Sequence, residues 1–215
     1  MAERLADLLD AAARGVYPAP DGRFEVVPSP PGRTDAVVAF TAHTVVAAGL
    51  DPETVAAQLP PESLSAPLLP AFLSWLAAQL SSQPGNLDVL LVAGRAEAPE
   101  VELMELDEAD HPRLRRAHRY RSDLRLHAPV GGGALVIVGR GLAGRYEVSI
   151  EVERDRRGAG LGRSLARAAP ALVPEEQPLF AQVAPGNAAS LRAFLAAGYR
   201  PIGAEVLFLK NQPTG

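Results

Sequence analysis

The sequence predicts a mixed α/β (α+β) fold for this chain of 215 residues. Short segments rich in β-branched residues, one of them strictly alternating, are interleaved with longer segments whose apolar residues recur at helical spacing. The hydrophobic fraction of 47% is ordinary for a globular protein, and a chain of this length buries a sizeable core. No internal repeat is visible.

The first part of the chain combines helical and strand patterns. Asp51 precedes a proline and supplies the N-cap of one predicted helix, and Pro70 restarts another. Helices are predicted at residues 3–16, 51–59 and 65–80, and strands at 23–29, 35–40 and 87–94.

The segment 100–127 changes from acidic to basic along its length. Its carboxylates come first, and five arginines follow them within a few residues. This pattern predicts a solvent-exposed helix whose positive charges pair with neighbouring carboxylates. The alternative is a basic patch that receives a phosphate. The arginines are Arg113, Arg115, Arg116, Arg119 and Arg121.

The second part of the chain contains a strand with clean alternation at 145–153. Val148, Ile150 and Val152 share one face of that strand, and Glu147, Ser149 and Glu151 share the other. Further strands are predicted at 123–129, 132–140, 178–185 and 199–210, and helices at 163–172 and 187–198.

Composition narrows the classes of protein to which the chain could belong. The absence of cysteine excludes a disulfide framework and indicates a reducing compartment, and the formal net charge of −4 argues against nucleic-acid binding. Residues 1–17 lack the apolar core of a secretory signal, and the longest apolar run, 36–50, is too short to cross a membrane. We therefore expect a soluble cytoplasmic protein with neither a nucleic-acid nor a membrane partner.

Several short motifs match known functional patterns, but the residues around them do not fit those functions. Gly139–Gly144 matches a dinucleotide-binding pattern, but an alternating strand follows it where a helix is required, so it predicts a hairpin connection. Gly162–Ala166 nearly matches a nucleophile elbow, yet every histidine precedes Ser164. The four histidines have no close helical pairing and no cysteine partner, so they form no metal signature.

The segment Arg157–Gly162 remains as a candidate binding loop. Three glycines in five residues follow the alternating strand and open directly into a helix. Glycine loses backbone entropy on folding unless the chain needs an unusual φ or close approach by another group. The free N–H groups at a helix N-terminus carry partial positive charge and bind pyrophosphate. No Gly-Lys-Ser/Thr follows, which excludes a nucleotide-hydrolysing P-loop.

This loop resembles the acetyl-CoA signature of the GCN5-related N-acetyltransferases (GNAT family), Arg/Gln-x-x-Gly-x-Gly/Ala. Arg157, Gly160 and Gly162 fill the three defined positions in order. Downstream, residues 184–203 resemble the second motif of the family, with Asn187 followed by Ser190 and by Gly198 and Tyr199. The resemblance covers about residues 124–209.

The resemblance implies a strongly bent mixed sheet flanked by helices, in which two neighbouring strands splay apart around the pantetheine arm of acetyl-CoA. It implies acetyl transfer to a primary amine of a small molecule or peptide by direct attack in a ternary complex, without a metal. The residues expected to bind acetyl-CoA are Ile150, Glu151, Val152, Arg157, Gly158, Ala159, Gly160, Leu161, Gly162, Arg163, Asn187 and Ser190.

The catalytic groups are less defined by the resemblance. Many members carry a tyrosine acid where this chain has Phe194, so Tyr199, Tyr146 or water would replace it. Glu151 and Glu147 are candidates for the base that deprotonates the amine, and the alternative is that they are solvated strand carboxylates. A non-catalytic acyl-CoA-binding or sensing module is the alternative function.

The resemblance also suggests a division of the chain. Residues 86–215 would form the transferase domain, and residues 1–85 a helix-rich α/β extension. The extension shows no catalytic constellation, yet its segment 68–80 is apolar enough to need covering. We therefore expect it to shape the acceptor site or a homodimer interface.

Overall fold

The computed structural model describes residues 4–60, 63–94, 101–107 and 111–210. The chain divides into two compact units. Unit 1 comprises residues 1–89, 142–144 and 202–215, and unit 2 comprises residues 90–141 and 145–201. Helices flank a sheet that contains both parallel and antiparallel pairs, which confirms the predicted α+β class.

Unit 1 follows the strand order β1-β3-β2-β10-β4, and β4 continues into unit 2. Asp51 Oδ2 accepts the N–H of Thr54, so the predicted cap of α2 is present. The helices are α1 (Arg4–Ala13), α2 (Pro52–Ala56), the short 3₁₀ turn η1 (Ala66–Leu68) and α3 (Pro70–Gln79). The strands are β1 (Arg23–Val27), β2 (Thr34–Phe40), β3 (His43–Ala47), β4 (Pro84–Val92) and β10 (Arg200–Leu209).

The strand β3 is absent from the sequence-based prediction. Residues 36–50 form one apolar run without a proline or glycine until Gly49, so periodicity alone does not reveal the turn inside it. The structure reverses the chain at Ala42, whose φ of 52° lies in the left-handed region. β2 and β3 then pair antiparallel, with Val37 opposite Val46.

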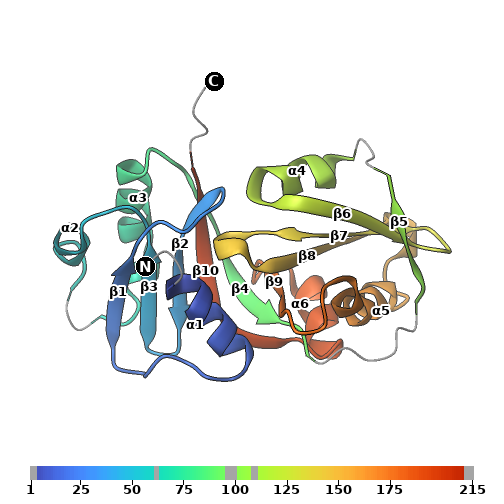
Figure 1. Ribbon diagram of the computed structural model, residues 1–215, viewed down its shortest axis with the longest axis horizontal. Helices are drawn as coiled ribbons and strands as arrows, with labels where there is room; N and C mark the ends of the chain where they lie inside the picture. The colour runs from blue at the N-terminus through green and yellow to red at the C-terminus, as the bar shows by residue number, and fades with distance from the viewer. Residues whose placement is uncertain (1–3, 61–62, 95–100, 108–110, 211–215) are drawn as a thin grey trace. The chain divides into compact units, whose positions relative to one another are not determined.

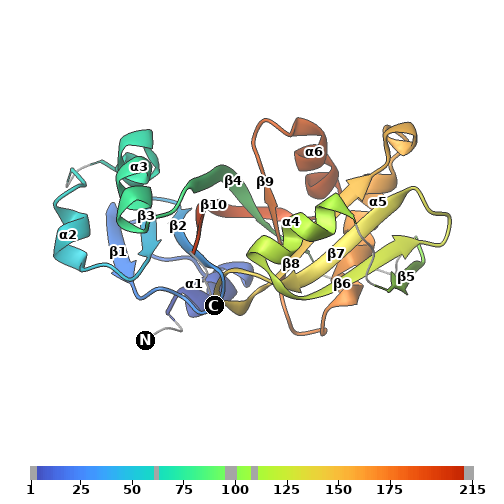
Figure 2. The ribbon, with the colours of Figure 1, turned by 90° about the horizontal axis from the view of Figure 1, so that it is seen from above.

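The strands of unit 1 are covered on both faces. Figure 2 shows α3 on one side of β1, β2 and β3, and α1 on the other. Phe72 and Leu76 of α3 pack with Val37, Val46 and Phe208 of the sheet, and all five side chains are buried. Most of the apolar surface of α3 is thus buried within unit 1.

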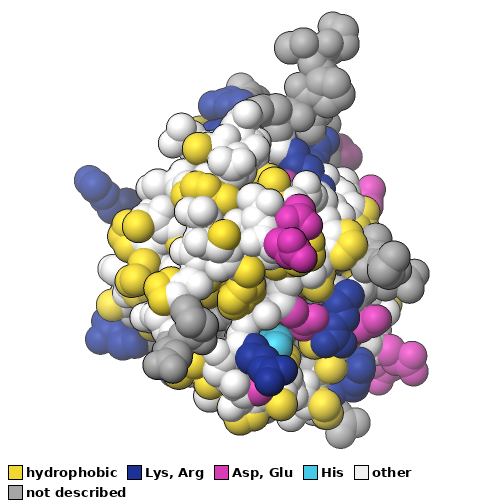
Figure 3. All heavy atoms as spheres, turned by 90° about the vertical axis from the view of Figure 1, so that its left-hand side faces the viewer, with side chains coloured by type: hydrophobic (Ala, Val, Ile, Leu, Met, Phe, Trp, Pro, Cys, Tyr) yellow, Lys and Arg dark blue, Asp and Glu magenta, His cyan; other side chains and the backbone are white. Residues whose placement is uncertain are grey.

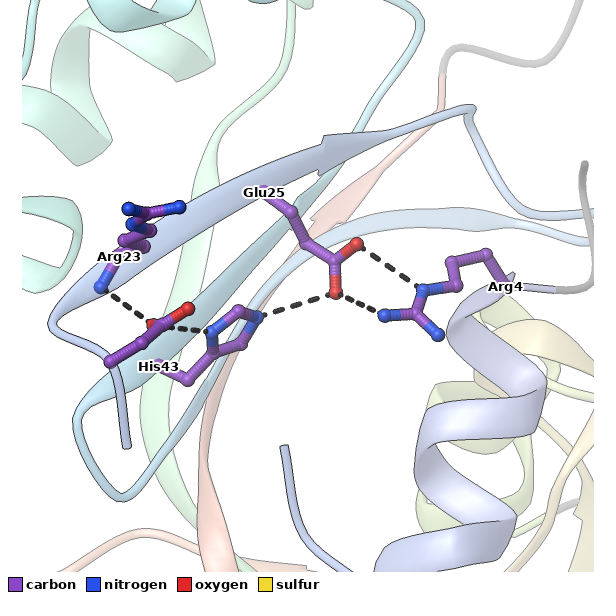
Figure 4. A network of polar contacts seen from close by, with 5 residues as sticks. Arg4, Arg23, Glu25 and His43 are labelled. Carbon is purple, nitrogen blue, oxygen red and sulfur yellow. Dashed lines mark hydrogen bonds and ion pairs between the residues drawn. The ribbon is translucent and has the colours of Figure 1, made fainter. Parts of the chain in front are cut away.

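A polar network links α1 to two strands of unit 1 (Figure 4). Arg4 donates to both carboxylate oxygens of Glu25, and the imidazole of His43 lies between Glu25 and Asp21. The hydrogen bond with His43 is the main cause that lowers the pKa of Asp21. Figure 3 shows the adjoining face of unit 1, where hydrophobic side chains lie in small groups among charged ones.

Unit 2 follows the strand order β9-β8-β7-β6-β5, with the end of β4 beside β9. The helix predicted within the segment 100–127 forms over residues 112–120 only, because residues 103–106 form a strand. Residues 108–110 lie outside the described chain. The strands are β5 (Leu103–Leu106), β6 (Ser122–Pro129), β7 (Ala134–Arg140), β8 (Tyr146–Val152) and β9 (Leu179–Val183). The helices are α4 (Pro112–Tyr120), α5 (Leu161–Ala168) and α6 (Ala188–Ala196).

The helices of unit 2 lie on opposite faces of its strands. Leu114 and Ala117 of α4 pack against Leu126 of β6 and Ile137 of β7. α5 and α6 lie on the other side (Figure 1). β7 and β8 pair antiparallel across residues 139–144, which confirms the hairpin interpretation of that glycine-rich segment. Among the described residues, no helix has the length and apolar character needed to span a bilayer.

Candidate functional site

The strands β8 and β9 begin as a parallel pair and then part. Among the described residues, the pairing comprises Tyr146 with Leu179 and Glu147 with Phe180 only, although both strands continue. The later residues of β8 therefore have an edge that pairs with no strand among the described residues. This is the splaying that the family resemblance implies.

The backbone groups on this open edge belong to Ile150 and Val152. Glu153 donates its N–H to the carbonyl of Gly133 at 3.0 Å, so the odd-numbered residues of β8 face β7 across the antiparallel pair. Because backbone bonding alternates along a strand, the N–H and C=O groups of Ile150 and Val152 face the open edge.

Two arginines donate hydrogen bonds to the carbonyl groups on this edge. Arg113 of α4 donates from Nη2 to the carbonyl of Ile150 at 2.8 Å. Arg157 of the glycine loop donates from Nε to the carbonyl of Val152 at 2.9 Å. The carbonyl groups on this edge thus accept from polar donors, as pairing with an extended ligand would require.

The glycine loop owes two of its three glycines to backbone conformation. Gly158 and Gly160 have φ of 84° and 87°, a region that side chains with a Cβ rarely adopt. Gly162 instead lies against Val152 Cγ2, which is 3.6 Å from the position that its Cβ would occupy. Arg163 and Ser164 donate back to the carbonyl of Gly160, so the N–H groups before them are the ones that a helix leaves open.

The loop, the open edge and α6 enclose a cavity of about 850 Å³ within unit 2. All twelve residues expected to bind acetyl-CoA line this cavity. The other lining residues are Arg113, Arg156, Ala189, Arg192, Ala193 and Phe194. The sequence had singled out Phe194, at the usual tyrosine position, but not as a binding residue. In the sequence, the alternative interpretation of residues 113–121 as a phosphate-binding basic patch is the only one that pointed toward a binding role for Arg113.

The cavity wall is strongly cationic. Five arginines line it, and Glu151 is the only carboxylate among its lining residues. A wall of this charge favours an anionic ligand, because guanidinium groups pair with phosphate and carboxylate in a bidentate geometry. The arginines are Arg113, Arg156, Arg157, Arg163 and Arg192.

Asn187 stands at the junction of the cavity and α6. Its side-chain Oδ1 accepts the N–H of Ser190 at 3.2 Å, so it caps the helix. Capping uses the oxygen only. The cap does not engage the amide nitrogen.

The two carboxylates predicted on β8 lie in different surroundings. Glu151 lines the cavity and has a side chain 39% exposed, whereas the side chain of Glu147 is 1% exposed and does not line the cavity. Glu147 accepts from Arg121 Nε at 2.7 Å and from Arg145 Nε at 2.9 Å. Burial alone would raise the pKa of Glu147, but Arg145 and Arg121 together hold that pKa below its ordinary value.

Arg121 extends this buried cluster toward β9. Its Nη1 donates to Ser149 Oγ and its Nη2 donates to Gln182 Oε1, both at 3.1 Å. Arg121 therefore bridges β8 and β9 where their backbones no longer pair. The cluster holds the two strands in their separated positions.

Gly141 provides a test of how tightly Glu147 is enclosed. A Cβ at Gly141 would lie 2.1 Å from Cδ of Glu147, with the oxygens hardly further away. We expect Gly141→Ala to lower the free energy of unfolding by about 1 to 3 kcal/mol, as overpacking does. Chemical denaturation would measure this. Gly131→Ala is the control, because a Cβ at Gly131 meets nothing within 4 Å.

Tyr199, the third predicted catalytic residue, lies behind the cavity wall. Its ring contacts Phe194 edge-to-face with centroids 4.8 Å apart, and it is 3% exposed. Its hydroxyl has no hydrogen-bond partner among the described residues, and burial raises its pKa. Phe194, not Tyr199, lines the cavity.

No cluster of three His, Cys, Asp or Glu side chains suited to a metal ion occurs in the described part of the chain. The polar side chains that line the cavity are the five arginines, Glu151, Asn187 and Ser190.

Comparison with protein-family models finds no match, and no curated protein matches the chain significantly. Among solved structures, an acetyltransferase of the GNAT family from Colwellia psychrerythraea shares 12% identity over 66% of this chain and 63% of its own, with a TM-score of 0.42. A GCN5-related N-acetyltransferase from Kribbella flavida shares 18% identity over 66% and 64%, with a TM-score of 0.39.

A GCN5-related N-acetyltransferase from Sphaerobacter thermophilus shares 16% identity over 69% of this chain and 56% of its own, with a TM-score of 0.40. The chain spans less than two thirds of the length of each of these three structures.

Proposed function

We propose that this protein transfers an acetyl group from acetyl-CoA to a primary amine. The observation that carries the proposal is the open edge of β8, which lies beside a glycine loop and a helix N-terminus in one cationic cavity. An extended chain that ends in phosphates matches both parts. Strand-like pairing with Ile150 and Val152 would hold the pantetheine arm, and the N–H groups of the loop would hold the pyrophosphate.

The N–H groups on the open edge of β8 also suit the chemistry of acyl transfer. A fixed backbone donor stabilises the negative charge that develops on the thioester oxygen when an amine attacks the carbonyl carbon. The carbon–sulfur bond then breaks, and the thiolate leaves with the electron pair. A thiol, whose ordinary pKa is about 8.5, is a tolerable leaving group without a protein acid, which is consistent with Phe194 in the cavity wall.

The amine must lose a proton before or during its attack. Glu151 is the candidate to receive this proton directly or through water, because it is the carboxylate among the cavity-lining residues. Glu147 remains a sequence-based candidate, although both of its oxygens accept from arginine.

The test is acetyl-CoA-dependent thiol release with a panel of small amines and peptide N-termini. Release with at least one amine supports the transferase. Tight acetyl-CoA binding without release from any amine would favour the acyl-CoA-sensing alternative. Absence of binding at millimolar acetyl-CoA would overturn both.

We also propose that residues 1–85 shape the acceptor site or a homodimer interface. Unit 1 buries the apolar side of α3 by itself but leaves Leu64 57% and Leu69 47% exposed. Light scattering on the full chain would measure the oligomeric state, and a concentration-independent monomer would remove the dimer proposal.

Asn187→Asp tests whether Asn187 contacts the ligand or only caps α6. Aspartate caps a helix as well as asparagine does, so the stability of the protein should be unchanged. The variant lacks the amide donor and adds a negative charge beside an anionic ligand. We expect the affinity for acetyl-CoA, measured by isothermal titration, to fall about tenfold. Unchanged affinity would show that capping is the sole role.

A further inference from the structure

We propose that Arg113 binds a carboxylate of the substrate, so that the protein acts on a donor or an acceptor with a carboxylate close to the transferred acyl group. This inference rests on the proposed function and narrows its substrate class. It follows from the face of β8 on which Arg113 lies and from the incomplete pairing of its guanidinium.

Arg113 and the glycine loop lie on opposite faces of β8. Val152 points toward α5, since Gly162 approaches its Cγ2. Glu151, the preceding residue, points to the opposite face, where Arg113 Nε lies 3.7 Å from its Oε2. If the phosphates of a ligand bind the loop, they lie on the opposite face of the strand from Arg113. Arg113 can then contact groups of the ligand that lie beyond the open edge, on the α4 face.

The region beyond the edge is where the reacting groups would meet. An arm that pairs with Val152 and Ile150 leads away from the loop, and its far end would lie near the carbonyl of Ile150. Arg113 Nη2 already contacts that carbonyl. A group attached to the acyl carbon or to the attacking amine would thus come within reach of the guanidinium.

The guanidinium of Arg113 is incompletely neutralised. Among the described residues, it donates to the neutral carbonyl of Ile150, and its buried Nε has no hydrogen-bond partner there. The separation of 3.7 Å from Glu151 is an ion pair without a hydrogen bond. Burial lowers the pKa of Arg113, Glu151 opposes this effect, and the positive charges of Arg121 and Arg116 add to it.

A carboxylate is the group that this arrangement fits best. The guanidinium has five donors in a planar fork, and carboxylate oxygens accept two of them side by side. Phosphate shares this chemistry, but the loop that suits it lies on the other face. The carboxylate could belong to an amino-acid acceptor or to the distal end of a dicarboxylic acyl group.

Two matched comparisons distinguish these sources. In the acceptor arm, each α-amino acid of a panel is compared with its α-carboxamide, using acetyl-CoA as donor. In the donor arm, succinyl-CoA is compared with butyryl-CoA, which has the same chain length without the carboxylate. Thiol release gives kcat/KM for each substrate. We expect the carboxylate member to be preferred by about 10- to 100-fold in one arm, the range of one charge-assisted hydrogen bond.

The preference should depend on Arg113. Arg113→Gln is expected to abolish it, and Arg113→Lys to retain part of it, because lysine keeps the charge but loses the fork. Arg119→Gln is the matched control, since it removes the same charge from the same helix at a residue that does not line the cavity. Thermal melts establish that each variant is folded.

The outcomes separate the inference from the function on which it rests. Thiol release with equal kcat/KM for both members of every pair would overturn the inference and leave the transferase intact. A preference that survives in Arg113→Gln would also overturn it. Absence of release with every substrate would overturn the proposed function and this inference with it.

Discussion

Replacing Glu147 by glutamine is expected to lower the free energy of unfolding by about 3 to 5 kcal/mol, the usual result of breaking a buried ion pair on one side. The side chain of Glu147 is 1% exposed, and those of Arg121 and Arg145 are 9% and 3% exposed. Glutamine has nearly the same shape but removes the negative charge that both guanidinium groups contact. Chemical denaturation of the full chain measures the change.

Glu151→Gln is the matched control for this prediction. It makes the same substitution on the same face of β8, four residues further along the strand. The pair of Glu151 with Arg113 spans 3.7 Å, and both side chains are more than a third exposed. Such pairs contribute at most about 1 kcal/mol. Equal losses of stability in the two variants would contradict the distinction between a buried and an exposed carboxylate.

The stabilisation by Glu147 has a defined dependence on pH. Its pKa in the folded protein is lowered by Arg145 and Arg121 despite burial, so the folded state binds the proton less readily than the unfolded chain. The contribution is therefore complete above the pKa of an unfolded glutamate and is lost as the pH falls through the folded pKa. The difference in stability between the native protein and Glu147→Gln should narrow over this acidic range and be constant near neutrality.

The sequence predicted the parts of the site that depend on neighbouring residues. The glycine loop, the alternation of β8 and the start of α6 at Asn187 are each set within a few positions of the chain. The loop was predicted because glycine spacing reflects a local conformational need, and the positive φ of Gly158 and Gly160 is that need.

The contacts between distant segments could not be predicted in the same way. Alternation places Glu147 and Glu151 on one face of β8 but does not reveal which of them is buried in the folded chain. Arg121 and Arg145 are arginines like many others in the sequence until folding brings both to Glu147. The position of Arg113 at the open edge of β8 likewise depends on how α4 packs. The β2–β3 hairpin depends on the reversal of the chain at Ala42, which no local pattern indicates.

Gly160→Glu is expected to weaken acetyl-CoA binding at least about 100-fold, the largest effect on function that we predict for a single change. Gly160 precedes α5 with φ of 87°, so any side chain strains the turn that aims the loop N–H groups. The added carboxylate would lie where the pyrophosphate is proposed to bind. A Cβ at Gly160 lies 3.8 Å from Nη2 of Arg163, so the new charge would also compete for that arginine.

Gly15→Glu is the control that applies the same strain and the same charge away from the cavity. Gly15 follows α1 with φ of 85°, and a Cβ there meets nothing within 4 Å, so the backbone strain and the added charge are matched at a residue that does not line the cavity. Isothermal titration with acetyl-CoA should show wild-type affinity for Gly15→Glu and severe loss for Gly160→Glu, with both variants folded in thermal melts. Equal affinities for the two variants would place the pyrophosphate elsewhere, because the ligand would then be indifferent to a carboxylate at the N-terminus of α5.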